Sequence, residues 1–363
     1  MIDLSLLPDG GMAWLDASGP ATHLVLSTRV RLARNLANHP FAPRASLEDR
    51  ETIYRDVLAA ARETVSLRNA LSFRLDRMER VDRQLLHERH LVSKELAGLE
   101  EPSAVRPGAA LLVQDRVGVM LNEEDHLRMQ GLRSGFALEE TYQEVDRLDF
   151  ELGQRLPFAF HPEFGYLTSC PTNVGTGLRA SVLIHLPGLV LTKEISKVLQ
   201  GLAQVGLTSR GLYGEGSELV GNFFQLSNQT TLGKSEKELL DHLGKMVRQV
   251  IEYEEQARQV LLRDARTIIE DKVWRAYGLL RNARTLSFEE TMSLLSGVRL
   301  GVGLGLVDRC GLYALNKLLV HTQPAHLAAG EGVRPDDPDL NVRRARFVRA
   351  LLEDEAARRG QTP

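Results

Sequence analysis

Cysteine is almost absent from this sequence, since only Cys170 and Cys310 occur among 363 residues. Two cysteines so far apart do not make a disulfide framework, which indicates a reducing compartment. The sequence also lacks an apolar run long enough to span a bilayer, and its N-terminus lacks the basic-then-apolar pattern of a secretory leader. We therefore expect a cytoplasmic protein with no membrane partner.

Strong net charge and internal repeats are missing as well. The formal net charge is −3, so nothing attracts the whole molecule to nucleic acid or to a membrane surface. Any anion site must therefore be local. A hydrophobic content of 43% is ordinary for a globular protein, and the length suffices for two domains that each bury a core.

Before about residue 235, short apolar runs alternate with Gly, Pro, Asn and Thr, as is typical of strands joined by loops. Strands are expected in residues 23–27, 109–113, 117–121 and 180–186, and helices in residues 47–65 and 138–152.

After Ser235 the pattern becomes helical. Ser235 and Ser287 each begin a sequence that fits a capping box, and the helical spacing that follows runs to Tyr277 and then to about His321. A turn-rich linker, residues 330–338, precedes a last helix over residues 342–358. The sequence thus predicts an α+β domain over residues 1–255 and an all-helical domain over residues 256–363, with the helix near Ser235 free to cross the boundary.

The most informative stretch is the polar run from Asn122 to Arg128, Asn-Glu-Glu-Asp-His-Leu-Arg, directly behind the apolar run 117–121. Charge at a strand end is most simply a solvated turn. Here an arginine accompanies the carboxylates, and arginines recur in other unusual segments, which indicates a site for both a cation and a polyanion.

Three other segments carry such arginines. In Ser27-Thr28-Arg29-Val30-Arg31, an expected strand, Arg29 and Arg31 point to one face. Residues 169–179 combine Cys, Asn, two glycines and a final arginine, and match neither the P-loop nor the Rossmann pattern. Residues 209–218 hold an arginine and two carboxylates among glycines, as in loops that close over ligands. Taken singly, the three segments also fit a polar sheet face, a turn and a surface loop.

Other features have simpler explanations. The run Gly301 to Gly305 follows no clear strand, so helix packing or a turn is expected. His321 and His326 lack partners at metal-ligand spacing, which favours surface or capping roles. Cys310 is expected in a core. A solvated helix face, or a dock for an acidic partner, is expected for Arg343, Arg344, Arg346 and Arg349.

Together, in this order, the four motifs resemble those of the phosphagen (guanidino) kinases over about residues 23–236. Four long motifs in the right order are far more specific than any one of them. The resemblance implies a catalytic domain with an antiparallel sheet flanked by helices. It also implies that ATP with Mg²⁺ donates the phosphoryl group.

The resemblance assigns roles residue by residue. It implies that the ATP phosphates are held by Arg29, Arg31, Arg128, Arg179 and Arg210, with Ser27 beside them. Glu124 and Glu215 would hold the guanidinium that accepts the phosphoryl group. Cys170 would lie beside that guanidinium as a tuned thiol, and Asn173 would position the transferring group. Mg²⁺ would be held mainly by the phosphates and water, with Glu123 nearby and no metal ligand set from the protein.

The chemistry needs such residues. A guanidinium with a pKa near 13 is a poor nucleophile, and neutralising it at pH 7 costs about 8 kcal/mol. Two carboxylates can orient it and accept its proton, in-line alignment of two bound reactants supplies roughly 7–11 kcal/mol, and arginines offset the charge on the phosphoryl oxygens.

The resemblance also bears on the substrate. Phosphagen kinases of free guanidines carry an additional helical domain before the Ser-Thr-Arg segment, which here begins at Ser27. We therefore expect an open guanidino site that suits an arginine side chain on a protein. The helical extension after residue 255 adds a resemblance to the bacterial McsB-type protein-arginine kinases. It implies that protein arginines are marked for Clp-type proteolysis in stress response, with an McsA-type activator, a Clp-type unfoldase or protease and a homodimer as possible partners.

One motif departs from that subfamily, whose helical domain carries Arg-Asp-x-x-Arg-Ala for binding phosphoarginine. Here Arg344 and Ala345 fit, but Leu340 and Asn341 replace the Arg-Asp pair. Loss of a bidentate arginine predicts weak or absent phosphoarginine binding there. Two alternatives to a protein-arginine kinase stay open: a kinase for free arginine or another small guanidine, and a non-catalytic adaptor that presents clients to a protease.

Overall fold

The structure, a computed structural model, describes residues 3, 5–99, 105–211, 220–358 and 360. The strands are β1 (Val25–Arg34), β2 (Leu71–Arg74), β3 (Ala110–Gln114), β4 (Val117–Leu121), β5 (Leu127–Ser134), β6 (Phe160–His161), β7 (Gly165–Tyr166), β8 (Leu178–His185), β9 (Leu207–Arg210) and β10 (Phe223–Asn228). The helices are α1 (Leu47–Arg62), α2 (Arg80–Glu88), α3 (Leu138–Gly153), α4 (Pro187–Leu191), α5 (Ile195–Gln204), α6 (Glu236–Asp264), α7 (Arg266–Asn282), α8 (Phe288–Gly303), α9 (Leu312–His321), α10 (Pro324–Glu331) and α11 (Leu340–Arg358).

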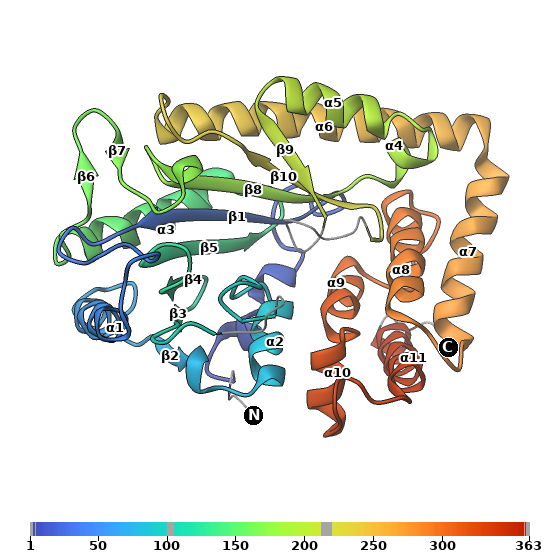
Figure 1. The fold of residues 1–363 in the computed structure, drawn as a ribbon. Coiled ribbons are helices and arrows are strands. Elements are labelled where there is room, and N and C mark those ends of the chain that lie inside the picture. Colours follow the sequence, from blue (N-terminus) through green and yellow to red (C-terminus); the bar gives the residue numbers. More distant parts are fainter. Residues whose placement is uncertain (1–2, 4, 100–104, 212–219, 359, 361–363) are drawn as a thin grey trace.

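One antiparallel sheet organises the described part of the first 235 residues. Its strand order is β2-β3-β4-β5-β1-β8-β10-β9, and β6 and β7 form a separate hairpin. Figure 1 shows the sheet across the middle of the molecule, the hairpin at one end, α6 along the top and the C-terminal helices α7 to α11 at the other end. The predicted α+β fold, an antiparallel sheet flanked by helices and followed by a helical region, is confirmed.

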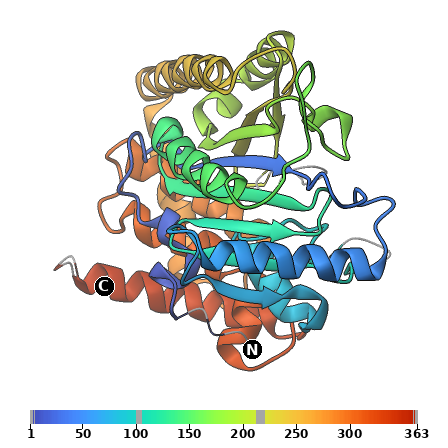
Figure 2. The same ribbon diagram turned by 90° about the vertical axis from the view of Figure 1, so that its left-hand side faces the viewer.

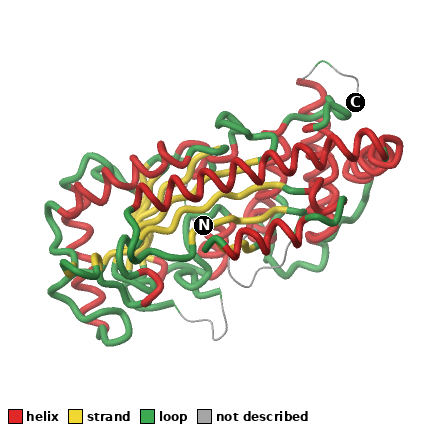
Figure 3. The backbone as a smooth tube through the Cα atoms, turned by 90° about the horizontal axis from the view of Figure 1, so that it is seen from above, coloured by secondary structure: helices red, strands yellow, loops and turns green. Residues whose placement is uncertain are grey.

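The two faces of β1 have different partners. Its even-numbered residues Val30 and Leu32 share a core with α1, α3 and α6. Figure 2 shows α1 (blue) and α3 (green) across the strands, and Figure 3 shows helices running over the yellow strands. Its odd-numbered residues Arg29 and Arg31 point to the opposite face. Alternation along a strand produces this division, and it leaves a polar face free to form a site.

Register then brings distant arginines together. Arg31 on β1 lies opposite Gln130 on β5 and Arg179 on β8. Arg128 is two residues from Gln130 along β5, so its side chain projects from the same face as that of Arg31. Residues far apart in sequence are thereby neighbours on one face of the sheet.

Capping residues set several helix starts. Ser46 and Ser235 form complete capping boxes with Asp49 and Glu238, as predicted for Ser235. Ser287 accepts from the Glu290 backbone, but the reciprocal bond is not formed, so the predicted second box is only half present. The helix from Ser235 runs to Asp264, and the predicted domain boundary at residue 255 falls inside it.

The helical region differs from the prediction in three places. Ala265, with φ −142° and ψ 28°, separates α6 from α7. Residues 304–311 separate α8 from α9, and the predicted linker, residues 330–338, begins inside α10.

Glycine is needed at position 301 of α8, because an added Cβ would lie 2.2 Å from Val273 of α7. Within the described residues, none of the helices is both long and apolar enough to cross a membrane.

Two predictions for the helical region are wrong. Arg344 does not lie on a solvated face: it is 2% exposed and donates to Thr322 O, Leu286 O and Asn341 Oδ1 at 2.7, 2.9 and 2.6 Å. His326 is not on the surface, because its ring is buried against Glu88. Cys310 is buried, as predicted.

Candidate active site

A cavity of about 630 Å³ lies on the polar face of the sheet. Its described lining includes seven cationic side chains, Arg29, Arg31, Lys94, Arg106, Arg128, Arg179 and Arg210, and three carboxylates, Glu95, Glu123 and Glu124. Cys170 and Asn173 line it as well. Ser27, two residues before Arg29 on β1, is not among the lining residues, and Glu215 lies outside the described residues.

The arginines are held close together at an electrostatic cost. Burial, together with the charges of Arg128 and Arg179, lowers the pKa of Arg29 to about 10. Burial and the neighbouring arginines lower the pKa of Arg31 well below its ordinary value. The Arg31 Nε is buried and has no hydrogen-bond partner among the described residues. An anion with several oxygens would supply the missing acceptor and the missing charge.

Glu123 partly neutralises this cluster. It is 3% exposed, accepts from Arg128 Nη1 at 2.5 Å and also accepts a short hydrogen bond from Ser93 Oγ. Burial alone would raise the pKa of Glu123, but Arg128 and Ser93 bring it below its ordinary value. Glu123 is therefore a carboxylate that fixes Arg128, and its position in the lining is compatible with water-mediated contact to a metal.

The polar run forms the turn between β4 and β5. The Asn122 backbone donates to His126 O at 3.0 Å and closes the turn. Asn122 has φ +57°, in the left-handed region that asparagine tolerates better than most residues. His126 accepts at Nδ1 from the Leu36 backbone, so its Nε2 carries the proton donated to Pro40 O at 2.9 Å.

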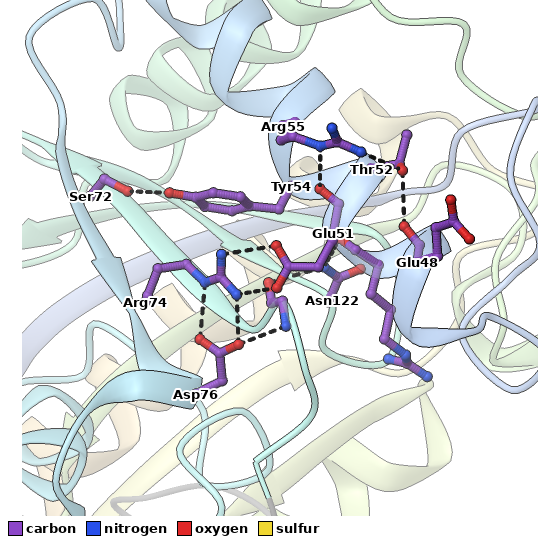
Figure 4. Close-up of polar contacts among 11 residues, drawn as sticks. Glu48, Glu51, Thr52, Tyr54, Arg55, Ser72, Arg74, Asp76 and Asn122 are labelled. Atoms are coloured by element: carbon purple, nitrogen blue, oxygen red, sulfur yellow. Dashed lines mark hydrogen bonds and ion pairs between the residues drawn. The ribbon is translucent and has the colours of Figure 1, made fainter.

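A second hydrogen-bond network supports this turn through Asn122, and Figure 4 shows Asn122 with Arg74, Asp76 and Glu51 of that network. Asn122 Nδ2 donates to Arg50 O and Gly108 O, both at 3.0 Å. Gly108 in turn donates to Asp76, whose carboxylate pairs with Arg74 at 2.6 Å. Arg74 also binds Glu51 of α1 and lies 4.5 Å from the ring centroid of Tyr54. Helix α1 and the loop at Gly108 are thus joined to the turn that carries the carboxylates.

Asp125 joins the turn to the Cys170 segment. It is 2% exposed and accepts from Asn35 Nδ2 at 2.7 Å and from the Ser169 backbone at 2.6 Å. On the far side, Asn173 Nδ2 donates to Glu124 Oε2 at 3.3 Å. Glu124, Cys170 and Asn173 therefore all line the cavity, and Asn173 contacts Glu124 directly.

Cys170 is half-buried at the entrance to a short 3₁₀ turn, and its Sγ lies 3.0 Å from Thr172 Oγ1. Three further parts of the lining were not predicted from sequence. Lys94 and Glu95 follow α2, Arg106 donates to the backbone oxygen of Glu123, and Gln225 accepts from Arg29 at 3.1 Å. Arg106 lies in Val-Arg-Pro-Gly, and only that arginine before a turn could have signalled it.

The comparisons with known proteins agree with this geometry. Residues 52–257 match the family described as "ATP:guanido phosphotransferase, C-terminal catalytic domain", and residues 266–362 match "Protein-arginine kinase McsB C-terminal domain". A protein-arginine kinase of Symbiobacterium thermophilum is 46% identical over 93% of this chain and 96% of its own length, and that of Bacillus subtilis is 40% identical over 96% and 95%. The chain belongs to the protein-arginine kinase family. It is accordingly a guanidino phosphotransferase.

Solved structures place this protein-arginine kinase family member among phosphagen kinases in fold. The duplicated taurocyamine kinase of Schistosoma mansoni aligns with a TM-score of 0.58 at 28% identity, over 70% of this chain and 35% of that one. A lombricine kinase aligns with a TM-score of 0.55 at 22% identity, over 70% of each chain, which shows the shared fold. The β1 arginines belong to the eight-stranded sheet, and the β4–β5 turn joins two of its strands.

Proposed function

We propose that the chain transfers the γ-phosphoryl group of ATP to arginine side chains of proteins. The observation that carries the proposal is the position of Glu124, which is held against Asn173 in an arginine-lined cavity. The Glu124 carboxylate suits a guanidinium, and the lining arginines suit polyphosphate. Substrate and phosphoryl donor would then meet within one cavity.

The residues divide the work. Paired hydrogen bonds to phosphate oxygens would come from Arg29, Arg31, Arg128, Arg179 and Arg210. Because these arginines repel one another, binding of a polyanion among them is favourable. Glu124 orients the guanidinium and accepts its proton as the nitrogen attacks phosphorus. Glu215 is proposed as its partner, Cys170 as a thiol beside the guanidinium, and Ser27 as a lesser contributor to the nucleotide site. Mg²⁺ would neutralise phosphate charge, with Glu123 as the near carboxylate.

Protein arginine is favoured over a free guanidine because the chain matches protein-arginine kinases along more than nine-tenths of its length. Arginine marking for Clp-type proteolysis in stress response, an McsA-type activator and a homodimer belong to the same proposal. So does a cytoplasmic location, since ATP is the donor and both cysteines are free thiols.

Mass spectrometry of phosphoarginine on an unfolded protein treated with the enzyme and ATP–Mg²⁺ tests the function. We expect acid-labile phosphoarginine with the wild type. With Glu124→Gln we expect none, while nucleotide binding persists, because the substitution removes the proton acceptor and leaves the arginines in place. Glu252→Gln, an exposed substitution on α6, serves as the matched control.

Each alternative predicts a different result. Phosphorylation of free arginine but not of protein would identify a small-guanidine kinase. Client binding with no phosphorylation of either would identify an adaptor, and near-normal turnover by Glu124→Gln would remove Glu124 from its proposed role. The proposed partner of Glu124 is tested by Glu215→Ala in the same assay.

A further inference from the structure

A second, larger cavity lies outside the catalytic one. It has a volume of about 870 Å³ and runs between α3 and the β6–β7 hairpin, the two elements at the end of the sheet remote from the C-terminal helices. We call it the docking groove and define it by Asp146, Asp149 and Phe150 of α3 with Phe158, Phe160 and Tyr166 of the hairpin segment. None of these residues has a part in the chemistry described above.

Aromatic side chains are left open to water in the docking groove. Phe150 is 67% exposed and Phe160 is 58% exposed, and they project from different elements. The Phe160 and Tyr166 rings lie 5.3 Å apart and the Phe158 and Tyr166 rings 6.3 Å apart, so the aromatic wall is continuous. A clustered apolar surface of this kind, rimmed by polar residues, is characteristic of interaction sites.

Carboxylates give the docking groove its electrostatic character. Asp146 and Asp149 line it and Glu236 lies close by, whereas Arg147 is the lining cation and Arg34 is committed to Asp149 at 2.7 Å. Neither Asp146 nor Glu236 forms an ion pair with a described residue. Burial raises the pKa values of Asp149 and Tyr166, and nearby carboxylates, Glu236 for both, add to each shift.

Arg34 shows how this surface holds a guanidinium. Its Cζ lies 3.4 Å from the centroid of the Tyr166 ring, and its Nε and Nη2 donate to the two oxygens of Asp149. An aromatic face with a carboxylate at its edge is the chemistry that binds arginine. Phe160, which is 58% exposed, and Asp146 line the same groove and supply a further aromatic face and a further carboxylate.

The docking groove is structurally continuous with the catalytic cavity. Tyr166 and Gly175 exchange backbone hydrogen bonds of 2.8 and 3.2 Å, and Asn173, two residues before Gly175, contacts Glu124. One stretch of chain therefore contributes both to the docking groove and to the lining of the catalytic cavity.

From these contacts we infer that the docking groove binds a flexible, arginine- and apolar-rich segment of the protein substrate, next to the arginine that enters the catalytic cavity. The inference rests on the proposed function. It adds that an unfolded protein is recognised at two sites: the catalytic cavity binds the arginine, and the docking groove binds a neighbouring segment. An arginine on a folded protein, whose neighbouring segment is not accessible, lacks the contact with the docking groove.

The test compares two substrates with the full chain. One is a reduced, carbamidomethylated protein that cannot fold, and the other is N-acetyl-arginine methylamide, which is too small to reach the groove. For Phe150→Ser with Phe160→Ser, we expect KM for the unfolded protein to rise about ten-fold, as for loss of two aromatic anchors, with turnover of the capped arginine unchanged. Phe164→Ser is the matched control, because Phe164 is an exposed aromatic of the same hairpin that does not line the groove.

A charge arm separates docking from general loss of apolar surface. Asp146→Lys should raise KM for the unfolded protein and reduce its dependence on salt, whereas Glu163→Lys, at the exposed turn of the hairpin and outside the groove, should leave both unchanged. KM values within two-fold of wild type for both groove variants would overturn the inference while leaving the proposed function intact. So would a change in oligomeric state confined to the Phe150 and Phe160 variant, which would assign the groove to a second copy. Failure of the wild type to phosphorylate any protein would overturn both.

Discussion

Arg31 illustrates, at the scale of a single residue, the conflict between binding an anion and being stable without one. Its charge is disfavoured by burial and by Arg29, Arg128 and Arg179, which is why its pKa is well below its ordinary value. The folded protein without nucleotide therefore holds this proton less tightly than the unfolded chain does. A neutral side chain at this position removes the repulsion between the arginines. It also removes a hydrogen-bond donor to the phosphate oxygens.

Arg31→Met is accordingly expected to raise the unfolding free energy of the nucleotide-free protein by about 1 kcal/mol, as other functional-site replacements do. The stabilisation gained on adding ATP–Mg²⁺ should fall and phosphoryl transfer should be lost. Thermal unfolding with and without nucleotide measures both effects. Arg62→Met, on the exposed side of α1, is the control; a nucleotide-free Arg31→Met protein less stable than wild type would contradict the expectation.

Asn122 is the positioning residue of the β4–β5 turn. Its side chain is 1% exposed and supplies two carbonyl oxygens with their donor, while its backbone takes φ +57°. Glycine adopts that backbone conformation without strain. Asn122→Gly therefore removes the hydrogen bonds and keeps the turn geometry available.

We expect Asn122→Gly to lower the unfolding free energy by about 1–3 kcal/mol, because the buried Gly108 carbonyl and the part-buried Arg50 carbonyl each lose a hydrogen bond. We also expect a lower kcat, because Glu123 and Glu124 are held less firmly. Denaturant unfolding and steady-state kinetics measure the two effects. Asp115→Gly, at a left-handed position in the β3–β4 turn, should leave kcat unchanged. Full kcat in a destabilised Asn122→Gly protein would restrict Asn122 to a structural role.

Sequence predicted the site residues that lie within contiguous motifs. Arg29 and Arg31 follow from strand alternation, and Glu124 follows from its motif. Asn35, Arg106 and Gln225 did not follow, because each acts through a contact with a segment far away in sequence. Arg344 was misjudged because helical periodicity shows which residues share a face, but not whether another helix covers that face.

At the scale of elements, α11 shows how a substitution alters a binding motif. Its first residue Leu340 is 8% exposed, and Asn341 accepts from Leu286 through its backbone and from Arg344 through its side chain. Arg344 is thus engaged within the protein. The motif that resembles a phosphoarginine site therefore acts here as a link between α11 and the residues that precede α8 and α10.

We therefore predict weak or absent binding of free phosphoarginine to this region. Titration of the full chain, with the catalytic cavity saturated by ATP–Mg²⁺, is the measurement. Leu340→Arg combined with Asn341→Asp should create binding, because it restores a bidentate donor and keeps an acceptor for Arg344. Tight binding by the wild type would refute the prediction.

Capping residues made helix starts the most predictable part of the elements, as at Ser235 and Ser287. Helix ends and breaks were less predictable. Ala265 carries no breaking signal, since alanine is a strong helix former, yet its backbone leaves the helical region between α6 and α7. Helix α10 was missed because its eight residues are too few to show a helical period.

At the scale of the whole molecule, two histidines, one buried and one half-buried, link the C-terminal helices to the α2 segment. His326 of α10 lies between Glu88 and Arg89 of the α2 segment, and His321 of α9 lies beside it and stacks on Phe347 of α11. Burial, with His326 adding to it, lowers the pKa of His321 to about 4. Below about pH 6.5 the His321 imidazole of the unfolded chain becomes protonated. In the folded protein the same imidazole stays neutral until the pH falls to about 4.

The unfolding free energy should therefore be highest above pH 6.5 and fall as the pH drops toward 4. His321 alone accounts for about 1–2 kcal/mol of the loss by pH 5. His321→Phe keeps the ring stack and removes the titration, so it should lose correspondingly less stability between pH 7 and pH 5 in denaturant unfolding. His161→Phe, an exposed hairpin substitution, is the control, and equal losses in both variants would contradict the assignment.

The shared core between the sheet and the C-terminal helices has a consequence for truncation and engineering. Leu26, Leu183 and Phe223 belong to strands, yet they pack in one cluster with residues of α7, α8 and α9. A protein truncated at residue 257, where the phosphotransferase match ends, would expose those apolar side chains to water. We expect such a protein to aggregate and to be degraded by proteases. The two matched segments thus behave as a single unit, in which a damaging substitution in α8 is expected to lower the amount of folded enzyme rather than alter its chemistry.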